Sequence, residues 1–144
     1  MTTIRPRVVR ALRDARTRMR DLAAAAHSTA SAERDVAARA LEDEQALLEA
    51  ALDNAAGSLA GARSVYEIDL VAEGTGVHRF AVADAAERHT EATAITEATA
   101  DQLRGRTRQL RTAERLVDLV DEHRSKHEAR AEQRSADDMA ARRR

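Results

Sequence analysis

Two histidines near the C-terminal end of the sequence have a spacing that suits metal binding on a helix. His123 and His127 lie four residues apart, so a helix would place both imidazoles on one face. In the zinc-protease pattern a Glu directly follows the first His, whereas this chain has Arg124 there. A metal held between the two rings is one interpretation. We favour the other, an exposed and charged helix face, and expect no metal.

The remaining candidates for chemistry are weaker. The segment 73–77 contains two glycines, but no Lys-Ser or Lys-Thr follows it and no strand precedes it, which argues against a phosphate loop. No Ser or Asp can be joined to a histidine as a triad from spacing alone. Carboxylate pairs such as Asp43-Glu44 lie on polar stretches, with no pocket to shift their pKa values. We therefore expect no enzyme, no catalytic residue and no cofactor.

The composition predicts long helices in place of a compact core. Among 144 residues there are one Tyr, one Phe and no Trp, while 34% are charged and Ala is abundant. Such a mixture is typical of coiled coils. The chain has no Cys, which excludes disulfides and thiolate chemistry. We find neither an apolar run long enough to span a bilayer nor an N-terminal signal peptide, and we expect a cytoplasmic protein.

The positions of the helix-breaking residues, Pro and Gly, predict an all-α fold. We predict a long two-helix antiparallel coiled-coil hairpin that spans residues 1–144 as one domain. Pro6 suits the first turn of a helix, and the next strong breaker is the glycine pair Gly74 and Gly76. We predict helix one at about 6–72, a turn at 73–77, helix two at about 78–135 and a frayed tail at 136–144.

Apolar residues recur at alternating spacings of four and three, which indicates the contact line, or seam, of a coiled coil. Two blocks in helix one follow this rule out of register with each other, which predicts a stutter between them. The first block is Val8, Leu12, Ala15, Met19, Leu22 and Ala26; the second is Leu41, Leu48, Leu52, Ala55, Leu59, Ala62 and Tyr66. The predicted seam of helix two is Val82, Ala85, His89, Ala92, Thr96, Thr99, Leu103, Arg106, Leu110, Ala113, Val117 and Val120.

Folding the chain about residue 75 would pair positions whose numbers sum to about 150. Leu103 would then lie level with Leu47 and Leu48, and Leu110 level with Leu41. The two aromatic residues, Tyr66 and Phe80, would flank the turn and clamp its mouth.

Charge is segregated along the sequence. Residues 1–20 carry seven Arg against one Asp, and residues 104–144 carry twelve basic and eight acidic residues. By contrast, 32–53 and 67–101 have net charges of −5 and −6. In a hairpin the end that holds both termini would be basic and the rest acidic, which would orient the protein in an electrostatic complex. The Arg residues wrap several helix faces without stacking aromatics, so we do not expect nucleic acid as a partner.

The layout of the chain resembles the FliJ family of flagellar type III export stalk proteins and their YscO-type virulence counterparts. The likeness lies in the Arg-rich opening Arg10-Ala-Leu-Arg-Asp-Ala-Arg, the Ala-rich stretch from Asp21 to Arg39, and a glycine-containing turn after a Tyr. It continues in Leu110-Arg-Thr-Ala-Glu-Arg-Leu-Val and in the ending Asp137-Asp138-Met139-Ala140. The middle departs from the family, with Ala and Thr where relatives carry aromatics and Gln.

This resemblance implies a stalk that inserts its terminal end into a hexameric export ATPase, promotes assembly of the ATPase, and contacts the export gate or substrate chaperones. It would reach the inner membrane only through these partners. The residues implied at the ATPase end are Arg10, Arg13, Arg16, Arg20, Arg124, Arg130 and Arg134. Tyr66 and Phe80 would contact the gate or chaperones. The alternative is a structural coiled-coil scaffold that oligomerises or recruits another helical protein.

Overall fold

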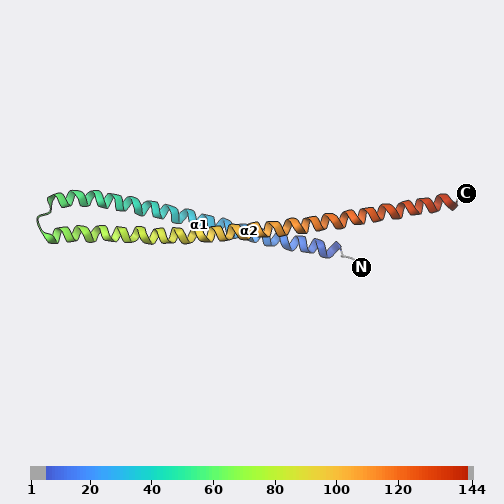
Figure 1. Ribbon diagram of the computed structural model, residues 1–144, viewed down its shortest axis with the longest axis horizontal. Coiled ribbons are helices and arrows are strands. Elements are labelled where there is room, and N and C mark those ends of the chain that lie inside the picture. Colours follow the sequence, from blue (N-terminus) through green and yellow to red (C-terminus); the bar gives the residue numbers. More distant parts are fainter. Residues whose placement is uncertain (1–5, 143–144) are drawn as a thin grey trace. The chain divides into compact units, whose positions relative to one another are not determined.

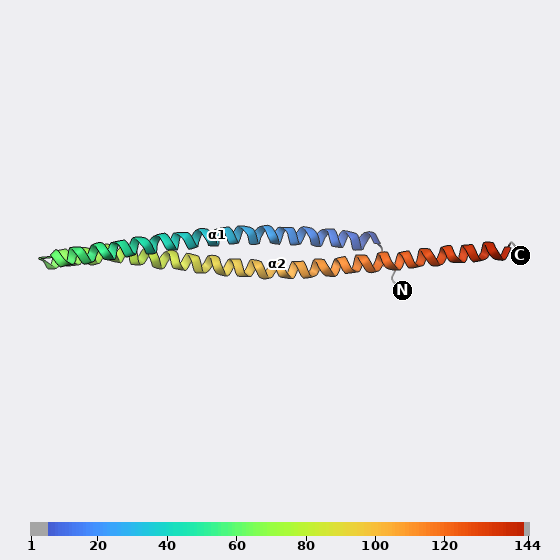
Figure 2. The ribbon, with the colours of Figure 1, turned by 90° about the horizontal axis from the view of Figure 1, so that it is seen from above.

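The computed structural model describes residues 6–142, and it confirms the all-α two-helix hairpin. Helix α1 spans Pro6–Gly61 and helix α2 spans Val65–Arg142. The two helices run in opposite directions and pack against each other (Figures 1 and 2). The part of the chain that the structure describes contains no strand. α1 begins at Pro6 as predicted, because a missing N–H costs nothing in the first turn of a helix.

The turn lies at residues 62–64, so the predicted turn at 73–77 is wrong. Ser64, the last residue of the turn, begins a capping box that starts α2. The Ser64 hydroxyl accepts a hydrogen bond from the backbone N–H of Glu67 at 3.3 Å. In return the Glu67 carboxylate accepts from the N–H groups of Ser64 at 3.3 Å and Arg63 at 2.7 Å. These reciprocal bonds satisfy N–H groups that a helix start leaves without partners.

The glycine pair that we took for the turn lies inside α2. Gly74 and Gly76 have helical backbone conformations, and neither has a positive φ. Glycine costs about 1 kcal/mol per residue in a helix interior, which a helix paired with a neighbour tolerates. Between them Thr75 is buried and donates a hydrogen bond to the carbonyl of Ala72 at 3.0 Å.

α2 also continues beyond the predicted end at residue 135. Residues 136–142 are helical, so this part of the predicted tail is wrong, and residues 143–144 lie outside the described range. The physical reason is local, because no Pro or Gly follows Gly105 and the last helical residues include several strong helix formers.

Each helix passes through two compact units, which we describe separately. The terminal unit combines residues 6–24 of α1 with residues 102–142 of α2. The turn unit comprises residues 25–101 and contains the capping box. We keep these two names below.

The seam of α2 is confirmed at every predicted position. All twelve residues from Val82 to Val120 are buried or half-buried, with Ala85, Thr96, Leu110, Ala113 and Val117 the least exposed. In the terminal unit Ala113 is the most deeply buried, at 2% exposure.

The seam of α1 differs from the prediction in its first half. Half-buried and buried residues follow one unbroken register, so there is no stutter. The members of this seam are Val9, Arg13, Arg16, Arg20, Ala23, His27, Ala30, Arg34, Ala37, Leu41, Glu44, Leu48, Ala51 and Ala55. Leu41, Leu48 and Ala55 were predicted correctly. The block from Val8 to Ala26 and the residues Leu52 and Leu59 are exposed and lie beside the seam.

The level at which the helices meet follows the true turn. In the turn unit the Thr96 hydroxyl donates to the carbonyl of Ala30 at 3.0 Å, and His27 Nδ1 lies 3.3 Å from the Thr99 hydroxyl. Paired residue numbers therefore sum to about 126. The predicted pairings of Leu103 with Leu47 and of Leu110 with Leu41 are wrong for this reason.

Candidate partner-binding surfaces

The interface within the terminal unit is apolar on α2 and rich in Arg on α1. Leu110, Ala113 and Val117 are buried, while the facing seam of α1 has only Val9 and Ala23 as buried apolar residues. Arg16 donates a hydrogen bond to the Gln109 amide oxygen at 2.7 Å, and Arg10 forms an ion pair with Asp121 at 3.0 Å. These polar contacts fix the pairing at the edges of a thin apolar core.

The structure places Arg10, Arg13, Arg16 and Arg20 along α1 in the terminal unit. Arg13 and Arg20 pair with the carboxylates of the residues that follow them, at 2.8 Å in both cases. The hydrogen bond that Arg13 donates to the Asp14 carboxylate raises the pKa of Arg13. The Nε atom of Arg20 is the buried side-chain polar atom without a hydrogen-bond partner in the described part of the chain. These four side chains therefore serve the hairpin itself as well as any partner.

The other three predicted arginines lie on an exposed stretch of α2. Residues 122–141 are all exposed, and the C-terminal stretch of α2 continues past the start of α1 within the terminal unit (Figure 2). Arg124 bonds to Glu128 at 2.6 Å, and that hydrogen bond raises the pKa of Arg124. Lys126 pairs with Glu122 at 2.6 Å. Pairs at this four-residue spacing support a helix that has no apolar face to bury.

The strongest apolar line of α1 in the terminal unit is exposed and lies beside the seam. We call Val8, Leu12, Ala15, Met19 and Leu22 the outer stripe. Val8 is 61% exposed and Leu22 is 68% exposed, whereas Val9 in the seam is 6% exposed. Sequence reasoning found these residues but assigned them to the wrong face. The sequence does hold a signal for the correct face. The line that begins at Val9, one position after the outer stripe, continues in the same register through Leu41 and Leu48.

α2 adds apolar residues on the same side as the outer stripe. A shallow groove of about 180 Å³ lies between the helices and is bounded by Leu12 on α1 and by Thr112 and Leu116 on α2. Leu119 is exposed one turn further along α2. The apolar surface of the terminal unit thus spans both helices.

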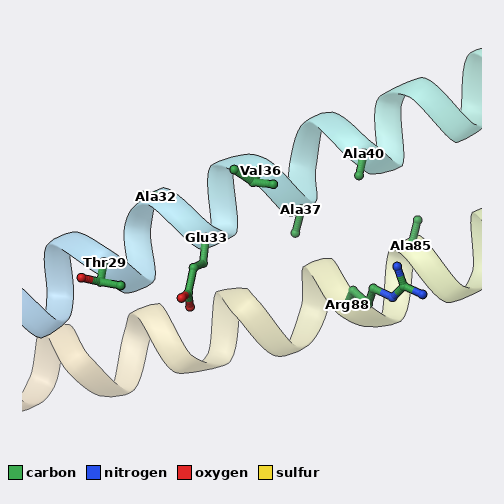
Figure 3. Close-up of a pocket in the computed structure, with 8 residues that line it drawn as sticks. All are labelled: Thr29, Ala32, Glu33, Val36, Ala37, Ala40, Ala85 and Arg88. Atoms are coloured by element: carbon green, nitrogen blue, oxygen red, sulfur yellow. The ribbon is translucent and has the colours of Figure 1, made fainter.

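A larger groove lies in the turn unit (Figure 3). It has a volume of about 430 Å³ and is lined mainly by small apolar side chains of α1, with Ala85 and Arg88 contributed by α2. Glu33 of α1 lines it as well, and Arg88 pairs with Asp84 of its own helix. The apolar members on α1 are Ala32, Val36, Ala37 and Ala40.

The aromatic clamp is not present. Tyr66 is 75% exposed in the first turn of α2, and Phe80 is 77% exposed on the same helix, about four turns further on. The prediction failed because the turn precedes both residues, so neither side chain faces the other across it. Both rings are available to a partner.

The described residues contain no cluster of three or more side chains that could hold a metal ion. His123 and His127 are both exposed and lie in the segment 122–141 of α2. Within the described range no helix has a segment long and apolar enough to cross a membrane. Comparisons with protein-family models, with curated proteins and with solved structures found no match to this chain.

Proposed function

We propose that this chain is a non-enzymatic stalk or escort component of a type III protein export apparatus. In this role the terminal unit enters the hexameric export ATPase and promotes assembly of the ATPase. The observation that carries the proposal is the exposed segment 122–141, which lies in a unit of strongly basic sequence and continues along α2 past the start of α1. The sequence of the terminal unit holds nineteen basic and ten acidic residues, a net formal charge of +9.

The segment 122–141 itself holds four basic and five acidic residues, so the net positive charge of the terminal unit comes from the rest of its sequence. A polar helix that projects from a basic unit suits insertion into a protein channel with acidic walls. Complementary charge speeds the encounter and selects the end that enters. Arg130 and Arg134 form no ion pair within the described residues and are exposed. Their charge is therefore available to a partner.

The test is binding of the full chain to the cognate export ATPase, together with stimulation of ATP hydrolysis. Arg130→Glu combined with Arg134→Glu is expected to weaken binding by about tenfold or more, because two attractive charges become repulsive. The matched control is Arg39→Glu with Arg79→Glu, two exposed arginines of the turn unit, which should leave binding nearly unchanged. Absence of binding by the unmodified chain, or equal loss in both variants, would overturn the proposal.

The same proposal assigns contact with the export gate or with substrate chaperones to Tyr66 and Phe80. Their exposure supports this role, since aromatic side chains provide large contact area at small entropic cost. Tyr66→Ser with Phe80→Ser should abolish gate or chaperone binding and leave ATPase binding intact. Loss of both interactions together would argue against separate contact sites.

A second candidate function is a structural coiled-coil scaffold that oligomerises or recruits another helical protein. The exposed outer stripe favours it, because an apolar line that α2 leaves exposed suits a second neighbouring helix. The two functions separate on one measurement, because a scaffold would neither bind an export ATPase nor stimulate its ATP hydrolysis.

A further inference from the structure

The outer stripe has the geometry of a second helix-packing face. Each of its residues comes one position before a seam residue, and one residue corresponds to a rotation of about 100° around an α-helix. α1 of the terminal unit therefore presents the apolar outer stripe at roughly a right angle to the Arg-rich seam that α2 covers. Helices that pack on two faces occur where three or four helices pack together.

The uncovered face is too apolar to be an ordinary exposed flank. Leu12, Met19 and Leu22 follow one another at coiled-coil spacing, and Leu116 and Leu119 of α2 lie on the same side. Contiguous exposed apolar surface with a polar border commonly marks an interaction site.

The border of this face is positively charged. Arg18 of α1 and Arg108 and Arg115 of α2 follow the outer edges of the apolar surface, and all three are exposed. None of them forms an ion pair with another described residue. Two terminal units placed face to face would bring these like charges together, so the charge favours an acidic occupant.

The turn unit of this same chain has the complementary character. Residues 25–101 contain fifteen acidic and five basic residues, a net formal charge of −10. Its groove is lined by alanines and Val36, which allow a close approach, and Glu33 lies in the lining. Asp43 and Leu47 continue the same flank of α1 and are exposed.

We infer that the protein self-associates, with the terminal unit of one copy packed against the turn unit of a second copy. Leu12, Met19 and Leu22 of the first copy occupy the alanine-lined flank around Val36 of the second. Arg18 and Arg115 of the first copy face carboxylates such as Glu33 and Asp43 of the second. The inference is independent of the export ATPase.

Sedimentation equilibrium of the full chain tests the inference. We expect concentration-dependent association to at least twice the 15.8 kDa mass of one chain at about 0.05 M salt. The association should weaken at about 0.5 M salt, because the charged borders are exposed and screened. A chain that stays monomeric at low salt and high concentration overturns the inference.

Two double variants locate the contact. Leu12→Gln with Leu22→Gln should weaken self-association by tenfold or more. Leu52→Gln with Leu59→Gln removes two exposed leucines from the other flank of α1 and should leave it within about twofold. Circular dichroism checks that all variants remain helical. Equal effects of the two pairs contradict the assignment.

A charge exchange tests which units meet. Arg18→Glu with Arg115→Glu should weaken self-association, and so should Glu33→Lys with Asp43→Lys. An equimolar mixture of these two variants should associate more strongly than either alone, because the reversed units attract each other again. Failure of the mixture to recover any association excludes contact between unlike units, whatever the result with the export ATPase.

Discussion

The terminal and turn units share one coiled-coil spacing but fill it with different side chains. In the terminal unit Leu110 and Val117 of α2 pack against a seam that includes Arg13, Arg16 and Arg20. In the turn unit the seam is built of small residues such as Ala30, Ala85 and Thr96, with a polar contact buried between the helices. Spacing therefore decides which face turns inward, while side-chain type decides how firmly it is held.

The two units also differ in which side chains of α1 are exposed to solvent. The terminal unit keeps its most apolar line exposed and places arginine stems against α2, because long basic side chains can cover apolar surface while their charged ends reach water. The following predictions test this difference between the units, beginning with the largest expected effect.

Leu110→Ala should lower the free energy of unfolding by about 2 kcal/mol, the low end for a leucine in a core, because the seam is thin. Leu110 is 8% exposed, whereas Leu116, on the same helix, is 39% exposed. Leu116→Ala is the control and should cost less than half as much. Urea denaturation followed by circular dichroism measures both, and equal losses would remove the distinction between seam and flank.

Gly74→Ala should raise the free energy of unfolding by about 1 kcal/mol. A Cβ atom added at Gly74 meets no heavy atom within 4 Å, and the residue lies in a helix interior. Gly61→Ala, at the last residue of α1, should change stability less. A loss of stability at Gly74 in thermal unfolding would restore the turn at 73–77.

Ser64→Ala should lower the free energy of unfolding by about 1 kcal/mol, because the N–H of Glu67 loses its capping partner. Ser58, whose hydroxyl bonds to the Asn54 carbonyl within α1, supplies the control. Ser58→Ala should be neutral or slightly stabilising, since Ala is the better helix former. Similar effects of both substitutions in urea titrations would contradict the capping box.

Thr96→Val should cost roughly 0.5–1 kcal/mol, the contribution of one net hydrogen bond. The substitution preserves the shape but removes the hydroxyl, which lies 3.0 Å from the Ala30 carbonyl across the turn unit and 2.8 Å from the Ala92 carbonyl of its own helix. Thr90→Val removes a hydroxyl that bonds within its own helix and is exposed, so it should cost less. Amide hydrogen exchange near Ala30 should rise in the first variant alone.

Acid should loosen the segment 122–142 before the paired helices. A hydrogen bond from Lys126 lowers the pKa of Glu122, so this pair stabilises the folded helix above the unfolded pKa of Glu. The contribution disappears as the pH falls through the lowered folded pKa of Glu122. NMR shifts of this segment should report the change, and Glu122→Gln should remove that transition.

The two-helix fold and the whole seam of α2 could be predicted from sequence, because the spacing of Val82 through Val120 admits one consistent register. The turn could not be placed by weighing glycines alone. Gly74 and Gly76 are typical of a helix end, but they lie inside α2. The feature that marks the true turn is the Ser64-Val-Tyr-Glu67 pattern, a capping box that starts a helix.

The face of α1 was missed for a different reason. The outer stripe was predicted as the seam because it is the more hydrophobic line. The sequence of one helix does not determine which of its lines the neighbouring helix covers. That depends on both helices, since the register shared with α2 requires Val9, Ala23 and Ala30 to face inward. Interaction surfaces of this kind become visible only once the partner helix is in place.

The unbroken register of α1 has a consequence for how such a protein can change in size. Seven residues make two turns of a coiled coil and return each side chain to its original face. In the turn unit, removal of one heptad from each helix at matched levels would preserve every inward-facing position. Loss of a single residue would instead rotate all that follows by about 100°. The hairpin can thus be lengthened or shortened in quantised steps, with the capping box and both ends retained.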